Sequence, residues 1–315
     1  MPRDFLHNHR QFGDLIRIVA DERRIVPALV EKDYWIMQSL YGLQQAGLAF
    51  QLKGGTSLSK GYGLIHRFSE DIDIRIEPPA DWQVMAGRNH DKPAHRESRR
   101  DFFDRLAETM AIDGIQAAER DETFDDVPKY RSGGIRLIYP GANGSVDSLK
   151  DGILLEVGFD DVAPNERRDI GSWAYDYAAS RVEILDNRAL AVPCYHPGHT
   201  LVEKLQAIST KFRQHQGTGQ LPPNFMRHYY DVACLLQDET VQAFVRTPEY
   251  LAHKRRRFPG ADNPVIAENE AFRLSDPDTR ARLERAYLAS SALYYDGQPP
   301  FEDLLERIAV WAPQL

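Results

Sequence analysis

The chain has 315 residues, of which 42% are hydrophobic, and this is enough to bury the core of one large domain or two modest ones. Its 39 Lys and Arg residues against 47 Asp and Glu residues give a net charge of −8, which excludes a protein coated in nucleic acid and leaves only local basic surfaces for RNA or DNA. With no apolar run long enough to cross a bilayer, no signal-peptide core and two cysteines outside any C-x-x-C spacing, we expect a cytoplasmic protein with reduced thiols, no zinc site and no membrane partner.

Residues 4–46 are predicted to form two helices. Apolar residues recur at helical spacing on both sides of Pro27, which interrupts the pattern. The second helix opens with the charged run Glu31-Lys32-Asp33-Tyr34. Taken alone, this run indicates a charged helix face with an aromatic anchor.

The next pattern is a glycine-rich turn. The apolar run 48–52 is followed by Gly54-Gly55-Thr56-Ser57 and then by a segment whose apolar spacing suits a short helix. A turn from a strand into a helix offers free backbone N–H groups and a helix N-terminus, and both favour phosphate. Most Gly-Gly pairs are only turns, so this pattern alone does not establish a binding site.

Residues 71–76 alternate as a strand, so Ile72, Ile74 and Ile76 share one face while Asp71, Asp73 and Arg75 share the other. Two carboxylates one pleat apart can hold a hard cation such as Mg²⁺ through oxygen ligands. A D-x-D pattern also occurs on solvated strand edges and in metal-dependent glycosyltransferases. Together with the preceding glycine-rich turn, it indicates a site for a metal–nucleoside triphosphate.

The two patterns in this order resemble the core motif of the DNA-polymerase-beta-like nucleotidyltransferase superfamily. The fuller strings, residues 53–58 and 67–73, are similar to the AbiEii/AbiGii-type toxin nucleotidyltransferases, a MenT-like family. The run at residues 31–34 and two later segments, Glu203-Lys204-Leu205 and residues 227–231, extend this resemblance.

Residues 80–130 are strongly charged and read as an insertion, with a predicted amphipathic helix from Ser98 to Met110. The Arg and His residues between Arg88 and Arg100 form either a solvated face or a basic surface that meets the substrate. His90 and His95 lack a third ligand nearby, which argues against a metal site.

Strands are predicted at residues 135–139 and 153–159, and again near 182–185 and 190–194, while residues 164–180 look irregular. In the second of these strands Glu156 falls on the face opposite the apolar residues, and we expect it to supply a third metal-binding carboxylate. Asp160 and Asp161 compete for that role, but they lie at the strand end, where solvation is easier.

The chain beyond Pro197 is predicted to be mostly helical, with one helix from His199, capped by Thr200, and another over residues 227–236. Arg227 and Asp231 are four apart and can pair on that second helix. Residues 254–257, Lys-Arg-Arg-Arg, form a second candidate basic surface.

The resemblance implies an α+β fold: a polymerase-beta-like mixed sheet with flanking helices, followed by a helical domain. The expected division is a nucleotidyltransferase domain over residues 1–195, including the charged insertion, and a helical domain over 196–315 that closes the active-site cleft. The metal ligands for Mg²⁺ or Mn²⁺ would be Asp71, Asp73 and Glu156, and the catalytic set adds Lys204 and Asp231. The nucleotide-binding residues would be Gly54, Gly55, Thr56, Lys60, Arg67, Ser69 and Lys204.

The implied function is that of a toxin in a toxin–antitoxin or phage-defence system, with a cognate antitoxin protein as partner. The toxin would transfer a nucleoside monophosphate from an NTP to an RNA acceptor, the tRNA 3′ end, and so block translation. Two other functions stay open: an NTP-binding sensor without catalysis, and transfer to a small molecule or a protein hydroxyl. Ser69, two residues before Asp71, is also a position where an added negative charge would inactivate the enzyme.

Overall fold

The protein is represented by a computed structural model that describes residues 4–141 and 151–315. The chain divides into two compact units. Met1–Gly61 and Phe68–Tyr195 form the first, which we call the sheet unit, and Tyr62–Arg67 with His196–Leu315 form the second, the helical unit. No helix in the described part of the chain is both long and apolar enough to span a membrane.

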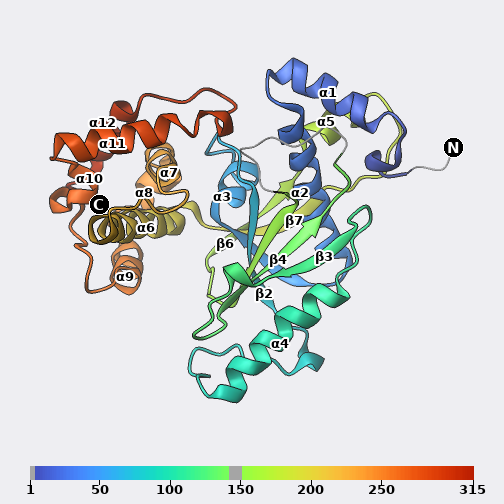
Figure 1. Cartoon of the computed structure of the whole chain (residues 1–315), viewed down its shortest axis with the longest axis horizontal. Coiled ribbons are helices and arrows are strands. Elements are labelled where there is room, and N and C mark those ends of the chain that lie inside the picture. The colour runs from blue at the N-terminus through green and yellow to red at the C-terminus, as the bar shows by residue number, and fades with distance from the viewer. Residues whose placement is uncertain (1–3, 142–150) are drawn as a thin grey trace. The chain divides into compact units, whose positions relative to one another are not determined.

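A seven-stranded mixed sheet in the order β3-β4-β5-β2-β1-β7-β6 is the core of the sheet unit (Figure 1). Its strands are β1 Ala49–Lys53, β2 Asp71–Glu77, β3 Ala117–Asp121, β4 Ser132–Ile138, β5 Ile153–Gly158, β6 Asn165–Ile170 and β7 Ala189–Tyr195. The pairs β2–β5 and β1–β7 are parallel, and the other neighbours are antiparallel. The mixed sheet and the α+β class predicted from the sequence are therefore confirmed.

The two faces of the sheet differ because paired residues on neighbouring strands point to the same side. Ile74 pairs with Leu52 on one side and with Val157 on the other, and all three are fully buried. Asp73 pairs with Lys53 and Glu156, which makes the opposite face polar in the middle of the sheet.

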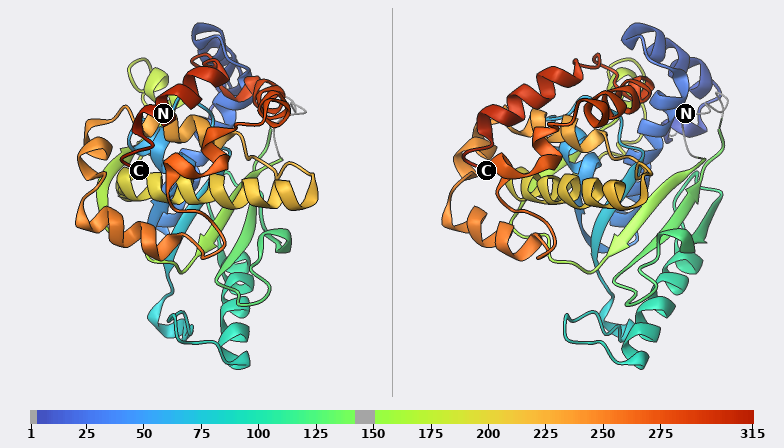
Figure 2. Two further views of the ribbon diagram at one scale, coloured as in Figure 1. Left: turned by 90° about the vertical axis from the view of Figure 1, so that its left-hand side faces the viewer. Right: turned by 60° about the vertical axis from the view of Figure 1, so that its left-hand side comes forward.

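Helices cover the apolar face and the ends of the sheet unit. They are α1 Phe12–Arg23, α2 Pro27–Gln45, the short α3 Gly54–Thr56, α4 Pro93–Thr109 and α5 Trp173–Ala179. Pro27 begins α2, where its missing N–H is harmless. α2 packs against β5 and β7, and α4 packs against β3 and β4. Figures 1 and 2 show α1 and α5 at one end of this unit and α4 at the other.

The helical unit is built around α6 Pro197–Thr218, which packs against four of its neighbours, α7 to α10. The remaining helices are α7 Arg227–Leu235, α8 Glu239–Phe244, α9 Pro248–Arg257, α10 Glu270–Arg273, α11 Pro277–Leu288 and α12 Phe301–Trp311. The N-cap of α6 is His196, whose side chain accepts the N–H of Gly198, so the prediction of Thr200 as the cap was wrong.

Residues 62–67 lie in the sequence between the glycine-rich turn and the D-x-D strand, yet they belong to the helical unit. The N–H of His66 donates to the Tyr230 hydroxyl at 3.1 Å, and the Tyr295 hydroxyl donates to the Ile65 carbonyl at 3.3 Å. Arg67 also forms a β-bridge with Tyr294. Contacts with residues far away in the sequence therefore hold this segment in place. The local spacing of apolar residues does not predict such contacts.

The helices and strands predicted from the sequence were wrong mainly at the edges of the sheet. Residues 164–180, expected to be irregular, contain β6 and α5, and β3 was not predicted at all. β3 and β6 are the two edge strands, and their charged sequences lack the alternation that identifies a half-buried strand. Residues 182–185, predicted as a strand, form none, and Val182 and Leu185 are exposed.

Candidate active site

The glycine-rich turn follows β1 and continues through α3 into a π-helical turn, Ser57–Gly61. Gly54 has a φ of +70°, which an L-residue rarely adopts. A Cβ atom added to Gly54 would lie 2.0 Å from Oδ2 of Asp73. The absence of a side chain thus lets the backbone of the turn pass directly against the second carboxylate of the D-x-D pattern.

Three carboxylates lie in one region of the polar face. Asp71 and Asp73 are one pleat apart on β2, and Glu156 is the partner of Asp73 on the parallel neighbour β5. Asp160 and Asp161, the alternatives to Glu156, are both exposed beyond the end of β5. The strand register therefore favours Glu156 as the neighbour of the D-x-D pair.

Carboxylate oxygens are the ligands that Mg²⁺ and Mn²⁺ use in proteins, so the donor set suits such an ion. The contact of Gly54 with Asp73 also keeps the backbone close beside these oxygens. As the side chains stand, no group of three or more His, Cys, Asp or Glu residues in the described part of the chain could hold a metal ion.

Two of the expected nucleotide-binding side chains have protein partners in the sheet unit. Thr56 is fully buried, and its hydroxyl donates to the backbone carbonyl of Asp71 at 2.5 Å. Lys60 donates to Oδ1 of Asp33 at 2.5 Å and lies over the ring of Trp173. The Thr56 side chain thus joins the glycine-rich turn to the start of β2, and Lys60 neutralises an aspartate of α2.

Arg67, Asp231 and Lys204 form a buried charge cluster inside the helical unit. Arg67 Nε and Nη2 each donate to one oxygen of Asp231 at 2.7 Å, and Lys204 Nζ lies 3.0 Å from Oδ2. The side chains of Arg67 and Asp231 are 1% and 0% exposed, and that of Lys204 is 12% exposed. Asp231, for which helical spacing suggested a partner in its own helix, pairs with two residues from other parts of the chain.

The protonation of this cluster follows from burial and charge. Burial alone would raise the pKa of Asp231, but Arg67 and Lys204 outweigh it and hold the pKa well below its usual range. Burial lowers the pKa of Lys204 despite the neighbouring carboxylate. Burial also lowers the pKa of His228, and both its ring nitrogens lie buried without a hydrogen-bond partner in the structure as described. Asp231 is therefore ionised and His228 neutral at physiological pH.

A family model described as "Nucleotidyl transferase AbiEii toxin, Type IV TA system" matches residues 35–307. The chain belongs to this AbiEii family. It is thus a nucleotidyltransferase toxin of a type IV toxin–antitoxin system, which implies an NTP substrate and an antitoxin partner. This confirms the family and the enzyme class predicted from the sequence.

Two solved structures are similar to this AbiEii-family chain. One is MenT4, a nucleotidyltransferase toxin from Mycobacterium tuberculosis H37Rv, with 16% identity over 94% of this chain and 96% of that chain and a TM-score of 0.44. The other is an antigenic nucleotidyltransferase-like protein from Paracoccidioides brasiliensis, with 12% identity over 73% of this chain and 95% of that chain and a TM-score of 0.36. No curated protein sequence matches the chain.

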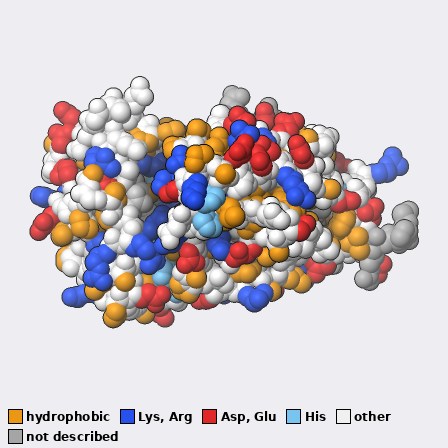
Figure 3. Space-filling view, turned by 90° about the horizontal axis from the view of Figure 1, so that it is seen from below, with side chains coloured by type: hydrophobic (Ala, Val, Ile, Leu, Met, Phe, Trp, Pro, Cys, Tyr) orange, Lys and Arg blue, Asp and Glu red, His pale blue; other side chains and the backbone are white. Residues whose placement is uncertain are grey.

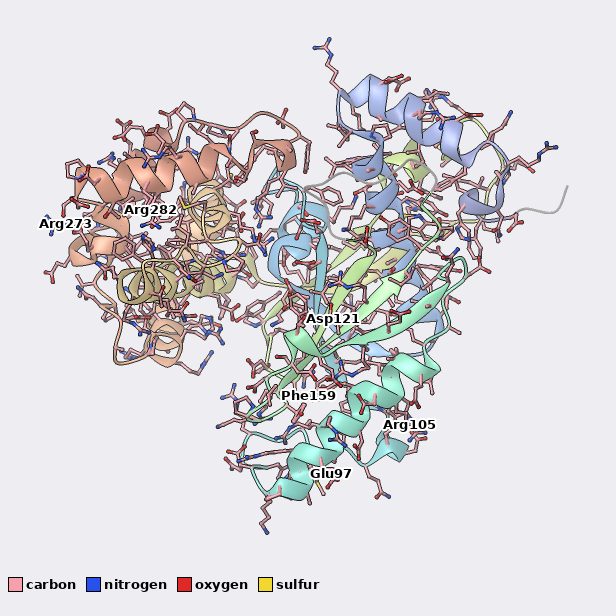
Figure 4. All side chains as sticks on the ribbon, in the orientation of Figure 1. Glu97, Arg105, Asp121, Phe159, Arg273 and Arg282 are labelled. Atoms are coloured by element: carbon pink, nitrogen blue, oxygen red, sulfur yellow. The ribbon has the colours of Figure 1, made fainter. Side chains whose placement is uncertain are left out.

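The two predicted basic surfaces of the AbiEii-family chain are partly occupied by internal contacts. Arg99 is fully buried, and its guanidinium donates to the backbone carbonyls of Met85, His90 and Lys129, so it organises the insertion from within. Arg105, labelled on α4 in Figure 4, lies 4.1 Å from the centre of the Trp82 ring. On the face shown in Figure 3, basic and acidic side chains are interspersed.

At the second surface, Lys254 donates to the carbonyl of Leu315 at 2.5 Å, and Arg257 lies 3.7 Å from Glu203. Arg256 contacts the ring of His253 at 2.7 Å. Burial lowers the pKa of Lys254 to about 8. Of this run, Arg255 and Arg256 are the exposed side chains.

Sequence reasoning missed the part played by Lys32 and Asp33, whose side chains are each 1% exposed. Their run was interpreted as a charged face, yet Glu31, Lys32 and Asp33 are all buried. The available signal was their position: three charged residues in succession followed by Tyr34 and Trp35, in a helix that contains no other charged residue.

Proposed function

We propose that this AbiEii-family enzyme transfers a nucleoside monophosphate from an NTP to the 3′ hydroxyl of an RNA, in a reaction that depends on Mg²⁺ or Mn²⁺. The tRNA 3′ end is the proposed acceptor, and its modification would block translation. The observation that carries the proposal is the pairing of Asp73 with Glu156 beside the close approach of Gly54.

In this proposal Asp71, Asp73 and Glu156 hold the metal ion. The ion would supply charge stabilisation at the transferring phosphate and orientation of the reacting oxygens. The backbone of Gly54, Gly55 and Thr56 binds the outer phosphates through its N–H groups, since the Thr56 hydroxyl is already used.

Lys204 is proposed to neutralise charge on the triphosphate, and Asp231, 3.0 Å away, holds that ammonium group in place and opposes the lowering of its pKa by burial. Arg67 donates to both oxygens of Asp231. These contacts support a role for Arg67, like Lys204, in holding the Asp231 carboxylate in place. Ser69 is 8% exposed and directly precedes the Glu70-Asp71 pair, so its proposed contact with the nucleotide requires a local opening.

Local basic side chains are proposed to hold the RNA. Arg255 and Arg256 are exposed on α9, and Arg88 and Arg100 are exposed on the insertion. Phosphate contacts by such side chains predict an affinity that falls steeply as salt rises. Replacing Arg255 and Arg256 by Ala tests the first surface, and replacing Arg88 and Arg100 by Ala tests the second.

The decisive experiment incubates the purified protein with each radiolabelled NTP, total RNA or purified tRNA, and Mg²⁺, Mn²⁺ or EDTA. Label that enters tRNA only with a divalent ion supports the proposal. Label in protein or in a small molecule instead would establish the alternative acceptors. NTP binding without any transfer would establish a sensor and overturn the proposed reaction.

A further inference from the structure

Two consecutive residues of α2 form buried ion pairs with two different parts of the nucleotide motif. Lys32 Nζ lies 3.3 Å from Oε2 of Glu70, and Asp33 Oδ1 accepts from Lys60 at 2.5 Å. The side chains of Lys32 and Asp33 are each 1% exposed, that of Glu70 is 8% exposed and that of Lys60 is 16% exposed. All four residues belong to the sheet unit.

The two partners lie in different pieces of the motif, one before and one after residues 62–67. Glu70 directly precedes Asp71, the first carboxylate of the D-x-D strand, and Lys60 lies in the π-helical turn that follows the glycine-rich segment. The segment between them, Tyr62–Arg67, belongs to the other unit. Within the sheet unit, α2 therefore ties together two pieces of chain that this excursion separates.

Asp33 has a second connection. Its Oδ2 accepts the backbone N–H of Trp173, the first residue of α5, at 2.8 Å, and the Trp173 ring lies 5.4 Å from Lys60 Nζ. Both oxygens of Asp33 are thus engaged, and its orientation is fixed from two sides. α2 itself is a helix of 19 residues packed against β5 and β7, which makes it a rigid base for these contacts.

Stability alone does not account for these charges. A buried ion pair is often no more stabilising than apolar side chains of similar volume, because both charges must be desolvated. An apolar pair at these positions would hold the helix to the sheet equally well. Ion pairs instead impose a defined distance and direction between α2 and each of its two partners, Glu70 before the D-x-D strand and Lys60 after the glycine-rich turn.

We propose that Lys32 and Asp33 are positioning residues that set the glycine-rich turn and the D-x-D strand at the separation required for transfer. Lys32 fixes the start of β2 through Glu70, and Asp33 fixes the end of the turn through Lys60. The inference rests on the proposed site, in which the turn binds phosphates and the strand holds the metal ion. A misplacement of about 1 Å at a reacting centre can lower the rate about 100-fold.

The test compares Lys32→Met and Asp33→Asn with Arg120→Met. Arg120 forms two other ion pairs of the sheet unit, 2.8 Å from Asp104 and 2.7 Å from Asp125, and it also donates to the Gly134 carbonyl. None of these partners belongs to the glycine-rich turn or the D-x-D strand. Each variant is assayed for NTP affinity, for kcat and KM of transfer with the full chain, and for urea unfolding. We expect Lys32→Met and Asp33→Asn to lower kcat about 100-fold, and Arg120→Met to lower stability without a comparable loss of kcat.

Variants that restore the ion pair distinguish a positioning role of Lys32 from a role in folding alone. Lys32→Arg keeps the charge and should retain most of the rate, and the exchange Lys32→Glu with Glu70→Lys should be more active than either single change. If Lys32→Met does not fold, Glu70→Gln, which keeps the size of the side chain, takes its place. Equal kcat in all variants of an active wild type, or a loss that Arg120→Met reproduces, would overturn the inference. A wild type that transfers nothing would instead refute the proposed function.

Discussion

Arg67 donates two hydrogen bonds of 2.7 Å to the carboxylate of Asp231, which lies 164 residues later in the sequence. A bidentate guanidinium–carboxylate pair is among the strongest charge-assisted contacts in proteins. Lys204 shares the same carboxylate, so one negative charge balances two buried or nearly buried cations.

Asp231→Asn should therefore lower the free energy of unfolding by about 3–5 kcal/mol, because it leaves the buried Arg67 without its counter-charge. Lys204→Met should cost less, since Arg67 still neutralises Asp231 and the Lys204 side chain is 12% exposed. Urea unfolding of the two variants measures the difference. A larger loss in Lys204→Met would contradict this account of the cluster.

Gly54→Ala should abolish nucleotidyl transfer. The new Cβ would lie 2.0 Å from Oδ2 of Asp73, so the carboxylate or the turn must move. Gly63→Ala is the matched control, because Gly63 has a similar φ of +66° but no atom within 4 Å of the added Cβ. Both variants carry a backbone strain of about 1–2 kcal/mol. Equal activity in the two would show that the contact with Asp73 does not matter.

Asp73→Asn and Glu156→Gln should each lower the transfer rate about 100-fold or more, because several kcal/mol of charge stabilisation would be lost. Their melting temperatures should change little, since both side chains are partly exposed on the polar face. Asp161→Asn, at an exposed position beyond the strand, serves as the control. Activity near that of the wild type in Asp73→Asn would place the metal site elsewhere.

Ser69→Asp should lose far more activity than Ser69→Ala. The added charge would stand two residues from Asp71 and would repel both that carboxylate and the triphosphate. Because Ser69 is only 8% exposed, we also expect a lower melting temperature for Ser69→Asp. Transfer rates and NTP affinities of the two variants provide the comparison, and full activity of Ser69→Asp would remove this residue from the site.

The stability of the helical unit should fall as the pH decreases below about 6.5. Burial lowers the pKa of His199 to about 4 and that of His253 to about 3, and lowers that of His228 well below its usual value. The unfolded chain takes up protons below a pKa of about 6.5 while the folded chain does not, so stability is complete above pH 6.5 and decreases below it.

Each of these histidines contributes a slope of at most about 1.4 kcal/mol per pH unit. Urea midpoints at several pH values measure the total, and His253→Leu should reduce the slope by the share of one group. A midpoint that does not change across this range would show that the three histidines are accessible to protons in the folded state.

The elements that could be predicted from the sequence are those whose formation depends on the spacing of nearby residues. Alternation identified β2 and β5, and their parallel pairing placed Glu156 beside Asp73, as expected for a third carboxylate. Edge strands such as β3 were missed because one neighbour and a solvated edge do not require apolar alternation. The roles proposed for Asp73 and Glu156 in metal binding stay predictions.

Pairings between distant residues could not be predicted. Arg227, four residues from Asp231, was the local partner that helical spacing suggested, whereas Arg67 comes from a segment far earlier in the chain. Lys32 and Asp33 looked like surface charges because their partners, Glu70 and Lys60, lie beyond the range of any helical or strand period. Burial of charge depends on which segments meet, and a single sequence records this only through motifs.

Residues 62–67 give the chain an order of assembly. Their partners include Tyr294 and Tyr295, so a chain growing from its N-terminus holds Arg67 and Ile65 without these contacts until residues 294–295 have been synthesised. A protein truncated after Tyr195 would likewise contain residues 62–67 without the rest of the helical unit to which they belong. For an enzyme of a toxin family, a chain that stops before residues 294–295 would thus lack a complete helical unit.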